Sequence, residues 1–109
     1  MLSTIDLIIN GDTYTLYDML NGYKFQEVQR ATIQLQKDKI DEVAYTNKLL
    51  SIFITKVSVT DPDTGNDKSI ASIPDVLTHI LEQGVEVLDE LTDYIQQKME
   101  ELQSEKKTK

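Results

Sequence analysis

Alternation of apolar and polar residues at the start of the chain predicts a β-hairpin over residues 4–17. Apolar side chains recur at every second position from Ile5 to Ile9, as they do on one face of a strand. Asn10 and Gly11 follow, a pair that tolerates the positive φ angles of a tight turn, and a β-rich return segment comes next. Two strands alone are barely stable in water, so we expect the hairpin to lie on helices or to pair with another chain.

After the hairpin, the period of the apolar positions changes from that of a strand to that of a helix. The pattern predicts helices over residues of about 24–36, 40–58 and 73–102. In the second segment, Leu50, Ile54 and Val57 share one helical stripe. Residues 51–59 are also rich in β-branched side chains, so a strand is a rival there. The length of the pattern favours the helix.

A polar loop over residues 61–68, which contains Pro62 and Gly65, is expected to end the second helix. Beyond the loop, Ser72 and Asp75 have the spacing of a capping box, in which each side chain bonds to the backbone of the other. This spacing predicts that the third helix begins directly after Ser72.

The last apolar stripe is longer than a domain of this size can cover. An uninterrupted helix over 73–102 would be about 45 Å long at a rise of about 1.5 Å per residue. Either Gly84 breaks it into two helices that fold back, or its distal half packs against a partner or a second copy, in a homo-oligomer. The sustained stripe favours the second alternative. The predicted seam consists of Leu88, Leu91, Tyr94, Ile95, Met99 and Leu102. Leu91→Glu is expected to weaken self-association and to leave the helicity largely intact.

Together these elements predict a single α+β domain over residues 1–102. It is expected to be mainly α, with a short N-terminal β-hairpin and a small helical bundle that ends in a long C-terminal helix. Residues 103–109 are predicted to form a disordered basic tail. A chain of 109 residues buries only a modest core, so one or two layers of secondary structure are expected.

Charge and composition narrow the class of partner. The formal net charge is −8, so nucleic acid is not expected as a partner, because binding to its backbone depends on clustered Lys and Arg. The absence of cysteine excludes disulfides and thiolate metal sites, and it fits a reducing compartment such as the cytoplasm. No apolar run is long enough to span a bilayer and the first residues lack a secretory signal, so no membrane role is expected.

Residue types that carry catalysis or bind metals occur in unsuitable patterns. The loop that starts at Asp61 lacks the Gly and Glu positions of a calcium-binding EF-hand. His79 is the only histidine, and we expect it at the surface near Asp75 and Glu82, without an accompanying nucleophile. The acidic residues of the last helix lack the Glu-x-x-His spacing of dinuclear metal sites, and the glycines are scattered singly. We therefore expect no catalytic residues, no cofactor, no metal and no enzymatic activity.

The order and texture of these elements resemble the tail assembly chaperones of long-tailed bacteriophages. The similarity spans residues 4–95 and lies in a hairpin turn at Asn10-Gly11, two helices, a polar loop, and a Ser69–Pro74 segment that leads into an acidic helix. Members of that family bind the tape measure and tail tube proteins in the cytoplasm of the infected bacterium and are absent from the finished virion. The resemblance implies a protein-binding function, in which apolar helix faces cover partner segments and an acidic outer face maintains solubility.

Two other functions fit the same pattern. One is a small oligomeric adaptor or regulatory protein that dimerises through the last helix, and the other is a structural component of the phage head-tail junction. A chaperone should associate with a large helical partner and be absent from particles. An adaptor should form a stable closed dimer with a small target, and a structural component should be found in purified particles.

Overall fold

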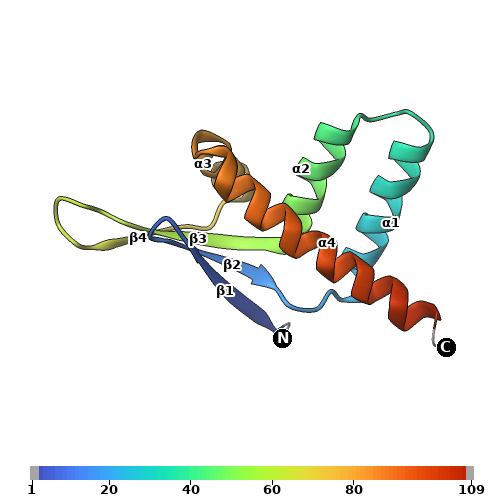
Figure 1. The fold of residues 1–109 in the computed structure, drawn as a ribbon, viewed down its shortest axis with the longest axis horizontal. Helices are drawn as coiled ribbons and strands as arrows, with labels where there is room; N and C mark the ends of the chain where they lie inside the picture. Colours follow the sequence, from blue (N-terminus) through green and yellow to red (C-terminus); the bar gives the residue numbers. More distant parts are fainter. Residues whose placement is uncertain (1–2, 108–109) are drawn as a thin grey trace.

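The computed structural model describes the backbone of residues 3–107 and the side chains of residues 3–102. The elements in chain order are β1 (Thr4–Ile9), β2 (Asp12–Tyr17), α1 (Gly22–Gln36), α2 (Glu42–Phe53), β3 (Ile54–Thr60), β4 (Asp67–Ile70), α3 (Ile73–Glu82) and α4 (Val85–Lys107). The four strands form one antiparallel sheet in the order β1-β2-β3-β4 (Figure 1). The predicted α+β class is confirmed, but the hairpin is half of a larger sheet and not a separate element.

The first hairpin has the turn that the sequence predicts. Asn10 and Gly11 have φ angles of 52° and 86°, and Leu7 pairs with Tyr14 across the two strands. Two successive positive φ angles give the turn a backbone twist that matches the twist of the flanking strands. Helix α1 then begins after Asn21, whose side-chain oxygen accepts a hydrogen bond from the backbone N–H of Lys24 at 2.9 Å.

The predicted helix over residues 40–58 is wrong in its second half. Helix α2 ends at Phe53, and Ile54 is already extended and begins strand β3. A β-bulge at Thr55 lets both Ile54 and Val57 face the core, although a regular strand places alternate residues on one face. The resulting spacing of three residues imitates a helix, which is why the apolar period failed to reveal the strand.

The polar segment after β3 closes a second hairpin and does not follow a helix. The backbone N–H of Asp61 donates to the carbonyl of Asn66, and that of Gly65 donates to the carbonyl of Asp61, both at 2.8 Å. Gly65 has a φ of 72°, a conformation that glycine adopts without steric cost. Strand β4 begins inside the predicted loop, at Asp67, and its pairing with β3 completes the sheet.

Helices α2, α3 and α4 lie on one side of the sheet with the core between them and the strands, and α1 packs against α2 beyond the end of the sheet (Figure 1). Fully buried side chains come from both layers, among them Tyr14, Leu16, Leu50, Phe53, Ile54, Val57, Val76, Ile80, Val87 and Leu91. The other face of the sheet is mostly polar, and Thr15 donates a hydrogen bond to Asp6 there at 2.7 Å. Ile8 is an apolar exception on this face and is 74% exposed. A single core therefore holds the molecule together from one side of the sheet.

The long C-terminal helix is broken at Gly84. Helix α3 ends at Glu82 and α4 begins at Val85, so the break at Gly84 that the first alternative expects is observed. The break turns the apolar faces of both helices toward the same core, which includes Val76 and Ile80 of α3 and Val87 and Leu91 of α4.

Two further predictions about these helices need correction. Ser72 precedes α3, but within the described residues its side chain accepts no cap hydrogen bond: the predicted one from Asp75 is not formed, and Pro74 has no N–H that could replace it. Helix α4 continues to Lys107, well into the segment predicted as a disordered tail. The last two residues of that tail, Thr108 and Lys109, lie outside the described residues.

Candidate partner-binding groove

Part of the seam predicted from the sequence lies inside the chain. Leu91 and Ile95 are 0% and 2% exposed and belong to the core beneath α4. The expectation that Leu91 faces a partner is therefore wrong, because the break at Gly84 turns this stripe toward the sheet of the same chain. The other predicted residues are half-buried: Leu88, Tyr94, Met99 and Leu102.

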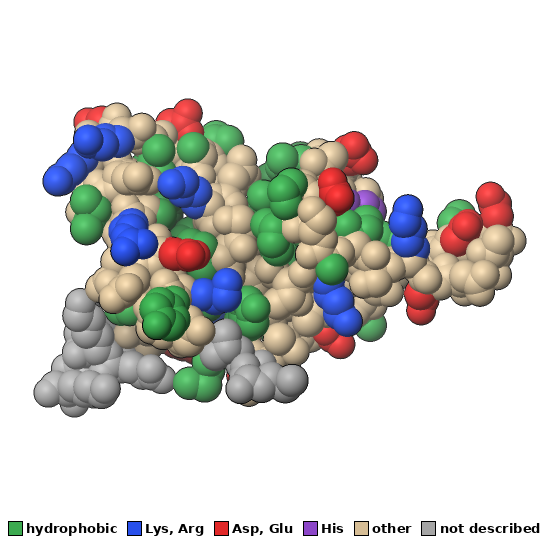
Figure 2. Space-filling model, turned by 180° about the vertical axis from the view of Figure 1, so that it is seen from behind, with side chains coloured by type: hydrophobic (Ala, Val, Ile, Leu, Met, Phe, Trp, Pro, Cys, Tyr) green, Lys and Arg blue, Asp and Glu red, His purple; other side chains and the backbone are tan. Residues whose placement is uncertain are grey.

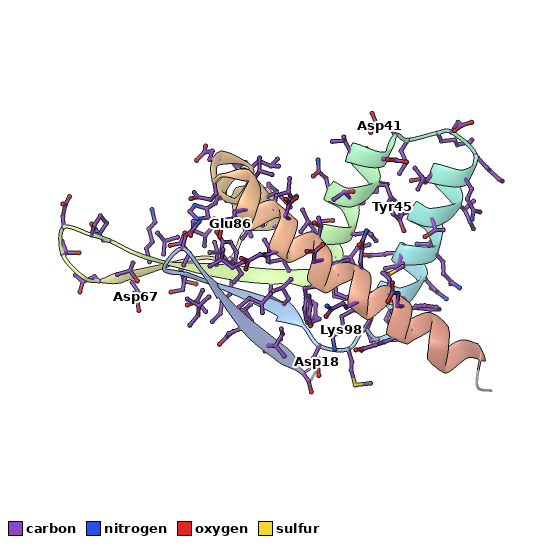
Figure 3. The ribbon with its side chains drawn as sticks, viewed as in Figure 1. Asp18, Asp41, Tyr45, Asp67, Glu86 and Lys98 are labelled. Carbon is purple, nitrogen blue, oxygen red and sulfur yellow. The ribbon has the colours of Figure 1, made fainter. Side chains whose placement is uncertain are left out.

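The distal half of α4 is anchored to the end of strand β2. The hydroxyl of Tyr94 donates a hydrogen bond to the carbonyl of Tyr17 at 3.0 Å. Lys98 Nζ lies 2.6 Å from Asp18 Oδ1 and 3.2 Å from Glu101 Oε2, and Figure 3 shows Lys98 beside Asp18. The hydrogen bond with Asp18 raises the pKa of Lys98, with burial acting in the opposite direction. These contacts fix the path of α4 beyond the core.

A groove of about 560 Å³ lies between α2 and α4. Its apolar lining consists of Leu35 from α1, Tyr45 and Leu49 from α2, and Ile95 and Met99 from α4. Its polar lining consists of Glu42, Thr46, Thr92, Gln96 and Glu100. The groove is thus built by three helices that are distant in the sequence.

A second hollow of about 270 Å³ lies between α1 and α4. It is lined by Phe25, Val28, Gln29, Thr32, Ile33, Met99 and Leu102. Ile33 is 48% exposed, and Met99 lines this hollow as well as the first one. Because Met99 is shared, we treat the two hollows as one concave surface and name it the α4 groove. Ile95, Met99 and Leu102 of the predicted seam line this surface.

The wall that faces α4 is the α1–α2 hairpin. The hydroxyls of Thr32 and Tyr45 lie 3.2 Å apart and are hydrogen-bonded, and Figure 3 shows Tyr45 between the two helices. Asp41 caps α2 by accepting a hydrogen bond from the backbone N–H of Ala44 at 2.8 Å. The sequence marks Leu49 as an apolar position of a helix, but nothing in it shows that this face meets α4. Sequence reasoning therefore missed this wall of the groove.

The charged residues that line the α4 groove are Glu42 and Glu100. Neither of them forms an ion pair with the side chains of residues 3–102. Basic side chains lie on the α1 side of the hairpin, where Arg30, Lys37 and Lys39 line a hollow of about 280 Å³ that adjoins the second hollow at Ile33. Figure 2 shows Lys and Arg side chains spread over the α1 and α2 side of the back of the molecule. The groove thus has a mixed lining of apolar and polar side chains, and the charged side chains that line it are both acidic.

A second group of titratable residues joins α3 to β2. His79 Nε2 lies 3.0 Å from Asp12 Oδ2 and both side chains are largely buried, so the expected surface position of His79 is wrong, although Asp75 and Glu82 share α3 with it as expected. The ring of Tyr14 is fully buried next to His79, with 6.3 Å between the ring centroids. Burial, and to a lesser degree the charge of Asp12, raises the pKa of Tyr14 to about 12. A phenol that keeps its proton this firmly is a poor base or nucleophile near neutral pH.

The described part of the chain contains no group of three or more His, Cys, Asp or Glu side chains that could hold a metal ion. None of the helices described for residues 3–107 is long and apolar enough to cross a membrane. No family model, no curated protein and no solved structure matches the chain. The function is therefore inferred from the geometry of the α4 groove together with the family resemblance.

Proposed function

We propose that this chain binds other proteins through the α4 groove and covers an apolar segment of its partner until that partner is assembled. Following the resemblance, the protein acts as a phage tail assembly chaperone whose partners are the tape measure and tail tube proteins. Its place of action is the cytoplasm of the infected bacterium, and the mature virion does not contain it.

The observation that carries the proposal is an apolar concavity that the helices of the chain leave unfilled. Met99 borders two surface hollows of about 560 and 270 Å³, and apolar side chains from three helices form part of their lining. Apolar surface left in water costs about 25 cal/mol per Å² relative to burial. A partner segment that covers Met99 and its neighbours recovers this free energy.

The ionisable groups with shifted pKa values support binding over catalysis. Burial raises the pKa of Tyr14 and of Tyr94, and the hydrogen bond with Asp18 raises the pKa of Lys98. Tyr14, Tyr94 and Lys98 all lie outside the lining of the α4 groove. Catalytic pockets, by contrast, gather groups with perturbed pKa values at the reacting centre.

The alternative of an adaptor that dimerises through the last helix has weaker support. A dimer seam along α4 needs its central apolar residues at the surface. Leu91, at the centre of the predicted seam, is buried in the core of the chain itself, and Ile95 is only 2% exposed although it borders the groove. What remains accessible near α4 is the concave groove, whose shape suits a different, convex partner.

The proposal is tested by co-expressing the tagged chain with the tape measure and tail tube proteins of the same genome and purifying on the tag. Two variants change the groove: Met99→Glu places a charge in it, and Thr46→Trp fills it from a half-exposed position. Ile8→Glu is the matched control, because Ile8 is exposed on the polar face of the sheet. We expect the chain and Ile8→Glu to retain a tail protein and both groove variants to lose it.

Thermal unfolding of each variant accompanies the purification, so that loss of binding is read only from folded protein. Equal recovery of a tail protein by the original chain and by a folded Thr46→Trp variant would contradict the groove as the binding site. Failure of the original chain to retain either tail protein would contradict the chaperone function.

A further inference from the structure

The walls of the α4 groove are helices, and this limits the conformation of what they bind. Backbone N–H and C=O groups along α1, α2 and α4 are paired within each helix and are not offered to a ligand. An extended segment in the groove would bury its own backbone groups without partners, unlike a strand added to a sheet edge. A helix satisfies its backbone internally and packs on neighbouring helices through side chains alone. The groove therefore fits a helical occupant.

The charges of the groove specify the flanks of that occupant. Glu42 stands on the α2 wall and Glu100 stands on α4, and no Lys or Arg lines either hollow. Both carboxylates lack an ion-pair partner among the side chains of residues 3–102. An acidic residue of a partner would be repelled by these carboxylates, whereas a basic residue would form a favourable pair. Since the two carboxylates come from opposite walls, basic residues are favoured on both flanks of the occupant.

We infer that the α4 groove binds an amphipathic helix with large apolar residues on one face and Lys or Arg on both flanks of that face. This inference rests on the proposed function and adds the chemistry of the partner segment. The apolar face covers Met99 and the surrounding apolar lining, and the flanking cations meet Glu42 and Glu100.

The size of the groove sets the length of the segment it covers. Its lining on α4 runs from Thr92 to Leu102, which corresponds to about 15 Å at about 1.5 Å per residue. A bound helix of about three turns spans this distance. A synthetic helical peptide of about 14 residues is therefore a sufficient probe.

The test uses three such peptides that share one Leu-rich face and carry Lys, Gln or Glu at the flanking positions. Affinity is measured by calorimetry with the full chain in about 0.15 M salt, where the Debye length is about 8 Å. The site is located by NMR shift changes at Thr46, Thr92 and Met99, which line the groove. We expect the Lys peptide to bind about tenfold more tightly than the Glu peptide, with shift changes at these residues.

Two double variants separate the local charges from the net charge. Glu42→Lys with Glu100→Lys reverses the two charges of the groove, while Asp63→Lys with Glu82→Lys reverses two exposed carboxylates outside the groove lining. Each Glu or Asp replaced by Lys adds two charges, so both pairs change the formal net charge from −8 to −4. We expect the double variant at Glu42 and Glu100 to prefer the Glu peptide and the control variant to keep the preference for Lys.

The outcomes distinguish this inference from the proposed function. If all three peptides bind in the groove with equal affinity, or if both double variants behave alike, the inference about basic flanks is overturned and binding in the groove stands. If none of the peptides shifts the resonances of Thr46, Thr92 or Met99, the inference falls whatever the pull-down of tail proteins shows. If the pull-down of a tail protein still depends on Met99, the proposed function stands, and the partner segment has a different chemistry.

Discussion

At the scale of single residues, the hydroxyl of Tyr14 is the least satisfied polar group of the core. It is buried and has no hydrogen-bond partner among the described residues. A buried hydroxyl without a partner costs about 1–3 kcal/mol. We therefore expect Tyr14→Phe to raise the free energy of unfolding at pH 7 by about 1 kcal/mol in urea titrations. The matched control is Tyr94→Phe, which removes the hydrogen bond to Tyr17 and should lower that free energy by about 1 kcal/mol. A loss of stability in Tyr14→Phe would contradict this account.

Tyr14 also makes stability depend on pH in the alkaline range. Burial raises its pKa to about 12 in the folded chain, against about 10 when unfolded. Below pH 10 the phenol is protonated in the folded and the unfolded state, so its titration takes nothing from the free energy of unfolding. Between about pH 10 and 12 the unfolded state releases the proton and the folded state retains it, so up to roughly 3 kcal/mol of stability is lost as pH rises. Across this range the free energy of unfolding should fall less steeply with pH for Tyr14→Phe than for the original chain. Identical slopes for these two proteins would count against a raised pKa of Tyr14.

Substitution of Leu91 distinguishes a role in the core of the chain from a role in an interface between chains. Because its side chain is 0% exposed, Leu91→Glu buries a charge without a partner. We expect it to lower the free energy of unfolding by about 4 kcal/mol or more and to abolish cooperative unfolding in circular dichroism. Val43→Glu, on a helix position that is 70% exposed, should change stability by less than about 0.5 kcal/mol. A stably folded Leu91→Glu variant with altered mass in solution would restore the dimer seam.

At the scale of elements, the break at Gly84 is decided by the core and not by the glycine. Gly84→Ala favours a continuous helix by about 1 kcal/mol, but straightening would expose Val76 and Ile80 or their counterparts on α4, at about 1.5–3 kcal/mol per side chain. An added Cβ meets no atom within 4 Å among the described residues. We therefore expect Gly84→Ala to keep the two helices and to change stability by less than about 1 kcal/mol.

The measurement for this variant is the set of NMR contacts between α3 and α4, combined with urea unfolding. Preserved contacts with nearly unchanged stability would agree with the account. Loss of the α3–α4 contacts, or a large gain in helical content, would show that the glycine itself determines the break.

The elements also show what local patterns can and cannot predict. The turn at Asn10 and Gly11 depends on local backbone preferences, so the sequence predicts both the hairpin over 4–17 and the two residues of its turn. For residues 54–60 the β-branched composition indicates the strand that is observed, but the bulge at Thr55 gives Ile54 and Val57 a helical spacing, which favours a helix in the apolar pattern. For the groove, Ile95, Met99 and Leu102 could be marked as apolar, but whether each faces the core or a cavity depends on the α1–α2 hairpin, which is a tertiary property.

At the scale of the whole molecule, charge is separated between the helices. Basic residues lie on α1 and the α1–α2 connection, as in Arg30, Lys37 and Lys39, and Figure 2 shows this side from behind. The exposed side of α4 is acidic and carries Glu86, Asp89, Glu90, Asp93, Glu100 and Glu101, of which Figure 3 labels Glu86. A net charge of −8 favours association with basic surfaces over acidic ones, and the acidic helix borders the groove that we propose as the binding site.

The most direct test of the central claim is to identify what touches the groove during assembly. Because the chain contains no cysteine, Thr46→Cys places a single reactive thiol in the groove, and Ser69→Cys places one on the exposed polar face of the sheet. Each variant is labelled with a photo-crosslinker, mixed with the tape measure and tail tube proteins, irradiated and analysed by mass spectrometry. The account predicts adducts from position 46 to an apolar helical segment of one of these proteins, and none from position 69. Adducts from position 69 alone, or a stable complex without adducts from position 46, would contradict it.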